Sequence, residues 1–110
     1  MTTAAPPKRE QKSKQKRKSE HLPPYNVVLL DDNDHSYEYV IHMLSSVFGH
    51  SPRKGYELAR KVDAAGRVIV ATTNLERAEL KREQIQSFGP DPLIPRCKGS
   101  MSANVEPAEG

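Results

Sequence analysis

The distribution of apolar and polar residues predicts a strand, an acidic loop and a helix in the first half of the chain. Residues 25–30 are a β-branched and aliphatic run of strand length. The cluster Asp31-Asp32-Asn33-Asp34 ends this run, because short polar side chains favour turns over strand continuation. From Val40 to Phe48, apolar residues recur at helical spacing and form one stripe. We therefore expect this acidic loop, residues 31–34, to lie between two core elements, where it suits recognition of a cation or of hydrogen-bond donors.

The next pattern predicts a second helix and a second strand. Ser51-Pro52 is typical of a helix start, because serine caps the first turn and proline there lacks only an N–H that has no helical partner. Gly66 is typical of a helix end, so this helix is expected over about residues 52–65. The run 67–72 is rich in β-branched residues and predicts the second strand.

A third helix and an edge strand complete the predicted fold. Thr73 to Glu76 fits a capping box that begins the helix, and Gly89-Pro90 ends it. Residues 92–97 contain two prolines, which an edge strand tolerates because one side of its backbone is unpaired. The order β-α-α-β-α-β predicts a small α+β sandwich of a three-stranded antiparallel sheet and three helices.

Charge and composition divide the chain into three parts. Residues 1–20 carry seven Lys or Arg side chains and two Glu, with almost no apolar side chain larger than Ala, so they cannot offset their ordering entropy. We expect residues 1–22 to be a disordered basic extension, residues 23–98 to be the α+β domain, and residues 99–110 to be a flexible tail. The remaining chain has ten basic and twelve acidic side chains, so the basic balance is not evidence that the domain binds nucleic acid.

The same sequence argues against several classes of protein. Cys97 is the single cysteine, which excludes an internal disulfide and fits a reducing compartment. No apolar run approaches membrane-spanning length and no signal-peptide segment is recognised, so we expect a cytoplasmic protein without membrane association. An enzyme is not expected, because no nucleophile has a positioned base and no glycine-rich loop would hold a phosphate.

Several separated segments resemble the ClpS adaptor family. They read YNVVLLDDND, EYV, VFG, KVDAAGR, VIVA and TNLERAELK, in this order over about residues 24–95. The resemblance implies a non-enzymatic adaptor that binds the free N-terminal residue of substrate proteins. It implies delivery of these N-degron substrates to a AAA+ Clp unfoldase, ClpA- or ClpC-like, and its peptidase, with the basic extension as a flexible arm. We expect a monomer that needs no cofactor and no metal.

The resemblance also implies an amine-binding site, at which this chain departs from the family. Asp31 and Asp32 match an asparagine and an aspartate that hold the substrate's α-ammonium, and Asp63 matches a histidine that is another amine partner. Carboxylates supply hydrogen-bond acceptors and negative charge, so these changes are compatible with amine binding. An Asp63 side chain that points away from the acidic loop would contradict this expectation.

A hydrophobic pocket and a docking face follow from the same resemblance. Tyr37 and Ala59 occupy the positions of two pocket methionines, and Val62 is expected to line the pocket with them. Ala59 widens the pocket, whereas Tyr37 fills or covers it with an amphipathic ring, so the preferred first residue is expected to differ from that of the family. Glu76 and Lys81 match residues that contribute to docking on the unfoldase.

Other interpretations of these residues stay open at this point. The acidic loop is also typical of a solvated turn with a helix cap. Its carboxylates and His35 are residue types that bind metals, although their spacing matches no EF-hand loop. The chain is alternatively a ClpS-like regulator that docks on the unfoldase without amine recognition. A further alternative is a nucleic-acid-associated protein that binds phosphates through its basic extension.

Overall fold

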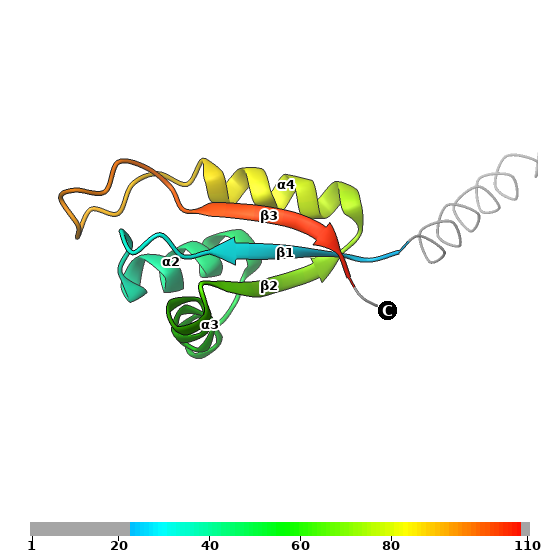
Figure 1. The fold of residues 1–110 in the computed structure, drawn as a ribbon, viewed down its shortest axis with the longest axis horizontal. Helices are drawn as coiled ribbons and strands as arrows, with labels where there is room; N and C mark the ends of the chain where they lie inside the picture. The colour runs from blue at the N-terminus through cyan, green and yellow to red at the C-terminus, as the bar shows by residue number, and fades with distance from the viewer. Residues whose placement is uncertain (1–22, 109–110) are drawn as a thin grey trace, which may run out of the picture.

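The computed structural model describes residues 23–108, so the expectations for the basic extension lie outside the described range. Three strands and three helices are found within it, and the predicted α+β class is confirmed. Figure 1 shows their arrangement. In chain order they are β1 (Tyr25–Leu30), α2 (Tyr37–Phe48), α3 (Pro52–Ala65), β2 (Arg67–Thr73), α4 (Leu75–Gln86) and β3 (Ser102–Pro107).

The sheet has β1 in its centre, with β2 and β3 as antiparallel neighbours on either side. Tyr25 lies opposite Thr73 of β2 and opposite Pro107 of β3, and an irregularity interrupts the β1–β2 register between Val27 and Val28. The acidic loop leaves β1 at one end of the sheet, where the loop between α4 and β3 also extends (Figure 1). The sheet thus brings together two loops that are far apart in the sequence.

The core forms where one face of the sheet meets the helices. Val27 and Leu29 of β1 are fully buried there with Met43 and Leu44 of α2 and Ile85 of α4. Burial of each such side chain contributes about 1.5–3 kcal/mol before entropy costs. The core therefore fixes the positions of the helices from which the site is built.

Local capping signals explain where α2 and α3 begin and end. The Ser36 and Ser51 hydroxyls accept hydrogen bonds from backbone N–H groups in the first turns of α2 and α3, respectively. Gly49 and Gly66 end the helices in the left-handed conformation, with φ of 76° and 84°, which glycine adopts without a Cβ clash. The prediction of a helix over residues 52–65 is confirmed.

The position of the third strand was predicted wrongly. Residues 92–97 form turns rather than an edge strand, and β3 lies at residues 102–107. The expectation of a flexible tail over residues 99–110 is therefore wrong for this strand. Alternate residues Ala103 and Val105 pack toward the core, and β3 completes the free edge of β1, a pairing between distant segments that local composition does not reveal.

The start of α4 also differs from the prediction. The N-cap is Asn74, whose side chain accepts a hydrogen bond from the Arg77 N–H at 2.8 Å, and Thr73 is still part of β2. The predicted capping box from Thr73 to Glu76 is therefore wrong by one position, because asparagine is at least as good a cap as threonine. The helix ends at Gln86. Over residues 23–108, no helix combines the length and the apolar character needed to cross a membrane.

Candidate functional site

The acidic loop is a folded turn with its own hydrogen bonds. The Asp31 N–H donates to the Gly66 carbonyl at 3.0 Å, which ties the start of the loop to the end of α3. The Asp31 and Asp32 carboxylates accept from the N–H groups of Asn33 and Asp34, respectively, at 3.2 and 3.0 Å. Asn33 has a φ of 62°, a conformation that asparagine tolerates better than most residues. The loop is thus held in one shape by local side-chain bonds, as the turn interpretation predicted.

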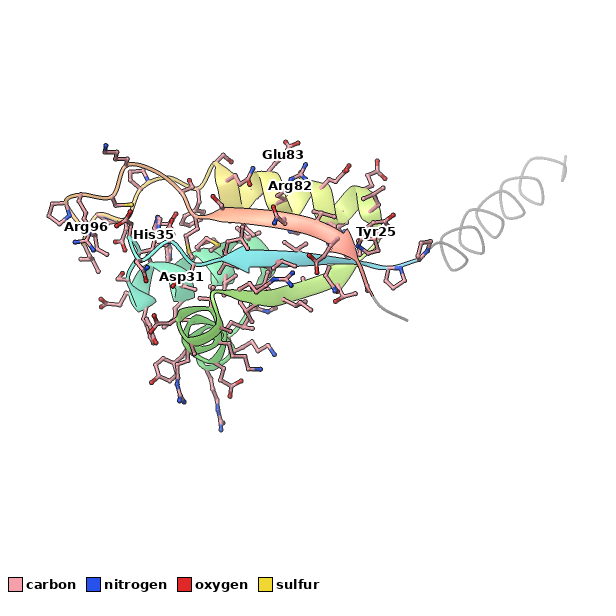
Figure 2. The ribbon with its side chains drawn as sticks, viewed as in Figure 1. Tyr25, Asp31, His35, Arg82, Glu83 and Arg96 are labelled. Carbon is pink, nitrogen blue, oxygen red and sulfur yellow. The ribbon has the colours of Figure 1, made fainter. Side chains whose placement is uncertain are left out.

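A pocket of about 140 Å³ opens beside this loop. It lies between the loop, the first turns of α2, the second half of α3 and the residue that precedes β3. The lining residues are Asp31, Asn33, His35, Tyr37, Val40, Ala59, Val62, Asp63 and Met101. Figure 2 shows Asp31 and His35 at this end of the sheet, whereas Tyr25 lies at the other end.

The pocket combines an apolar floor with an acidic rim. Val40, Ala59, Val62 and Met101 are each at most 3% exposed and belong to the hydrophobic core. The rim carries the carboxylates of Asp31 and Asp63, so both side chains border one cavity. An apolar group with an adjacent positive charge is the kind of ligand that fits this combination.

A hydrogen bond crosses the pocket rim from α2 to α3. The Tyr37 hydroxyl donates to Asp63 Oδ2 at 2.8 Å. The bond to Asp63 is the main reason why the pKa of the Tyr37 hydroxyl is raised above its ordinary value, with burial and the Asp63 charge adding to it. The hydroxyl therefore remains a neutral donor. Asp63 and Asp31 of the acidic loop line the same pocket, an arrangement that is compatible with the predicted site.

Asp32 differs from the other predicted amine-binding residues, because it is not among the residues that line the pocket. Its Oδ1 atom faces His35 Nδ1 at 2.8 Å and also accepts the Asp34 N–H. Five residues of the predicted set thus line one pocket: Asp31, Asp63, Tyr37, Ala59 and Val62. Asp32 does not belong to this lining.

The segment between α4 and β3, residues 87–101, is here called the long loop. It contacts the acidic loop and His35, the residue that follows it. His35, whose side chain is only 3% exposed, places Nε2 at 2.8 Å from the Gly99 carbonyl and at 3.3 Å from Cys97 Sγ. Arg96 donates from Nε to Asp34 Oδ1 at 2.9 Å and from Nη2 to the Asn33 carbonyl at 3.2 Å. The label of Arg96 in Figure 2 marks this end of the molecule.

A buried carboxylate strengthens the connection between the two loops. Asp91 is 3% exposed, and it accepts hydrogen bonds from the Ser36 N–H at 2.6 Å and the Leu93 N–H at 2.8 Å. Burial alone would raise the pKa of Asp91, but the hydrogen bonds from Ser36 and Leu93 outweigh it and hold this pKa below its ordinary value. Asp91 is thus ionised in the folded protein and fixes the residue that caps α2.

Four lining residues were not in the predicted site. Val40 lies one turn after Tyr37 on α2, so helical spacing alone places it on the same wall. Asn33 and His35 belong to the segment already recognised as a possible ligand cluster. Met101 had no local signal, because it reaches the pocket only through the pairing of β3 with β1. Residues 23–108 contain no group of three His, Cys, Asp or Glu side chains arranged to hold a metal ion.

The two predicted docking residues both lie on α4 but in different environments. Glu76 is exposed in the first turn of the helix. Lys81 is half-buried: its Nζ donates to the Val47 carbonyl at 2.7 Å and lies 5.7 Å from the centre of the Phe48 ring. The outward side of α4 also exposes Leu75 and Leu80, at 41% and 52%.

Comparisons of the sequence with known proteins identify one family. The sequence model of the family described as ATP-dependent Clp protease adaptor protein ClpS matches residues 20–92. The chain is similar to the ATP-dependent Clp protease adapter protein ClpS of Roseobacter denitrificans, with 33% identity over 73 residues, 66% of this chain and 65% of that protein. It is also similar to the protein of the same name from Ruegeria pomeroyi, with 32% identity over 66 residues, 60% of this chain and 58% of that protein. The match thus spans less than two thirds of either relative.

A solved structure shares the fold. The chain superposes on Agrobacterium tumefaciens ClpS2 bound to L-phenylalaninamide with a TM-score of 0.67, covering 78% of this chain and 98% of that one, at 24% identity. At this identity the likeness establishes the architecture. The family match covers most of this chain and includes the acidic loop, α2 and α3, which contribute to the pocket lining. The chain therefore belongs to the ClpS family of Clp protease adaptor proteins.

Proposed function

We propose that this protein is a non-enzymatic adaptor that binds the free N-terminal residue of a substrate protein and delivers it to a AAA+ Clp unfoldase. The observation that carries this proposal is the pocket itself, in which Asp31 and Asp63 stand at the rim of an apolar floor. An N-terminal residue has two complementary parts, an α-ammonium and a side chain, both bonded to the same Cα atom.

The charge at the rim supports binding of the α-ammonium. In the part of the chain that the structure describes, Asp34 and Glu106 form ion pairs with arginines and Asp32 lies against His35, whereas neither Asp31 nor Asp63 has a basic partner. An ammonium has three N–H donors and no acceptor, so it needs several acceptors at short range. Charge-assisted bonds of this kind contribute about 1.5–3 kcal/mol each. Two unpaired carboxylates on one cavity are a suitable set.

The size of the pocket limits the first side chain. A cavity of about 150 Å³ is known to hold one benzene molecule, and this pocket has a similar volume of about 140 Å³. We expect it to accept the side chain of Leu or Phe and to exclude the larger indole of Trp. L-phenylalaninamide, the ligand in the structure of Agrobacterium ClpS2, pairs one ammonium with one benzyl group and is a fitting chemical analogue.

The delivery step would use the outward side of α4. Glu76 is exposed there beside Leu75, and Leu80 lies further along the helix, so the surface offers an acidic and an apolar contact to a ClpA- or ClpC-like unfoldase. Lys81 already bonds to the Val47 carbonyl. We propose that Glu76 contacts the partner directly, and that Lys81 acts in docking by joining α4 to the end of α2.

Fluorescence anisotropy with labelled peptides tests the proposal. The peptides are identical except for the first residue, which is Leu, Phe, Trp or Ala, and each is prepared with a free and an acetylated N-terminus. We expect the free Leu and Phe peptides to bind the full chain, with weaker binding at high salt, and the acetylated peptides not to bind. Equal binding of free and acetylated peptides would contradict amine recognition. Absence of any binding, with retained association with the unfoldase, would instead support the regulator without an amine site.

A further inference from the structure

We propose that the Tyr37 hydroxyl competes with the ligand's ammonium for Asp63, so that a hydrogen bond between α2 and α3 closes the pocket until a free N-terminus arrives. This hydrogen bond is called the Tyr37–Asp63 bridge. The inference rests on the proposed function and adds a specificity-determining residue to it: Tyr37 makes entry into the pocket depend on the amine and not on the side chain alone.

The bridge joins two of the elements that line the pocket. Tyr37 is the first residue of α2 and Asp63 lies in the last turn of α3, and both line the cavity. The hydroxyl and Oδ2 are 2.8 Å apart, so the bond joins two opposite walls. Ala59 lies one helical turn before Asp63 and is only 1% exposed, which places the apolar floor beneath the bridge. A side chain that reaches this floor therefore lies beside the tyrosine ring.

The helices that carry the bridge are packed closely against each other. A Cβ atom at Gly55 would lie only 3.2 Å from Ile41 Cα, so α3 and α2 approach closely at this glycine. The tyrosine side chain has more freedom than the helices. Tyr37 is 36% exposed, and its ring meets Tyr56, which is 48% exposed, edge-on with 5.8 Å between ring centres. Rotation of Tyr37 toward solvent is therefore the simplest way to open the pocket.

The chemistry of the two donors decides which ligand can open the bridge. The Tyr37 hydroxyl offers Asp63 one neutral donor, and its raised pKa keeps it in that form. An α-ammonium offers three N–H donors and a positive charge, which is the stronger partner for a carboxylate. An apolar group with a blocked amine offers Asp63 no positive charge and must displace the bridge without that gain. Because Asp63 is exposed, water replaces the lost hydroxyl, and the discrimination against such a ligand comes from the missing charge-assisted bond.

Replacement of Tyr37 by Phe tests the bridge, because it removes the hydroxyl and keeps the ring. Tyr56→Phe is a matched control, since it makes the same change on the neighbouring exposed ring, which forms no bond to Asp63. We expect Y37F to bind the free Phe-first peptide about three- to tenfold more tightly than the natural protein, because the competitor for Asp63 is gone. Y56F should change this affinity by less than about twofold.

The possible outcomes separate the bridge from the proposed function. If the natural protein binds free but not acetylated peptides, and Y37F binds equally or more weakly, competition for Asp63 is wrong while amine recognition stands. If no variant binds any peptide, both are rejected. A second measurement uses ¹³Cζ-labelled tyrosine in the natural protein. The Tyr37 signal, assigned by its absence from Y37F, should move on saturation with free peptide, and an unmoved signal would overturn the proposal.

Discussion

The acidic loop has two sides with opposite electrostatic roles. On the pocket side, Asp31 borders the cavity together with Asp63 of α3, and neither carboxylate has a basic partner within residues 23–108. Asp32 and Asp34 do not line the cavity: Asp32 faces His35 at 2.8 Å and Asp34 accepts from Arg96 at 2.9 Å. Carboxylates adjacent in the sequence are thus divided between one that borders the cavity without a basic partner and two that lie against a histidine and an arginine.

This difference distinguishes carboxylates that are available to bind a cation from carboxylates that hold the acidic loop in its shape. A carboxylate with a basic partner has its charge compensated and contributes mainly to the shape of the loop. A carboxylate without such a partner attracts a cation from solution, more strongly where an apolar surface excludes water. The sequence pattern Asp-Asp-Asn-Asp does not reveal this division. The partner of Asp34 is Arg96, which belongs to the long loop and lies far along the chain.

Removal of charge from the pocket side should give the largest effect on binding. The double variant Asp31→Asn with Asp63→Asn keeps hydrogen-bonding groups of the same size but removes both charges. We expect the affinity for a free Phe-first peptide to fall about 30-fold or more, and the salt dependence of binding to decrease, because the attraction between two carboxylates and the ammonium is lost. Isothermal titration calorimetry at two salt concentrations measures both effects.

The matched control makes the same change on the paired side. Asp32→Asn with Asp34→Asn should lower the thermal midpoint of unfolding, because His35 and Arg96 lose their charged partners, and should reduce peptide affinity by at most about threefold. If the two double variants lose affinity equally, the acidic residues act as one cluster, and the proposed difference between the pocket-lining and the paired carboxylates is wrong.

Replacement of Asp91 should give the next largest effect, on the free energy of unfolding and on how it depends on pH. Its pKa is lowered in the folded protein, so its contribution is complete above its unfolded value of about 4 and is lost as the pH falls through that value and below. We expect Asp91→Asn to lower the free energy of unfolding at pH 7 by about 1–3 kcal/mol, because Ser36 and Leu93 lose a charged acceptor. Between about pH 5 and pH 2, the variant should lose less stability than the natural protein.

Urea unfolding at pH 7 and pH 3 measures this difference. Glu83→Gln is the control, since Glu83 is exposed on α4 and its side chain has no bond to the long loop. The control should have the same stability as the natural protein within about 0.5 kcal/mol. An Asp91→Asn protein as stable as this control at pH 7 would show that the long loop does not depend on its buried carboxylate.

The elements that sequence analysis located correctly are those that local interactions determine. Ser51, Pro52 and Gly66 define α3 because each acts within one helical turn. The acidic loop was recognised because a strand-length apolar run meets four short polar residues. Within the site, Tyr37 and Ala59 followed from the family resemblance, and both line the pocket.

The features that sequence analysis missed depend on contacts between distant segments. β3 could not be located from composition, because Leu93 and Ile94 make residues 92–97 look more strand-like than the true strand. The pairing of Asp32 with His35 is local, but the Gly99 carbonyl and Cys97 that hold the other side of the imidazole come from the long loop. Without that loop, nothing in the pattern indicates which acidic residues face the pocket.

The ion pair between Arg96 and Asp34 should give the smallest effect, and it tests what the long loop does. The Arg96 and Asp34 side chains are 72% and 46% exposed, so solvent screens the pair and Arg96→Ala should cost about 0–1 kcal/mol of stability, less at high salt. A double-mutant cycle with Asp34→Ala isolates the pair from other effects of either change. If peptide affinity changes by less than about twofold in every variant, His35 and Asp91 suffice to position the acidic loop. A larger loss of affinity than of stability would mean that the exposed pair helps to orient Asp31, and that the two sides of the loop are coupled.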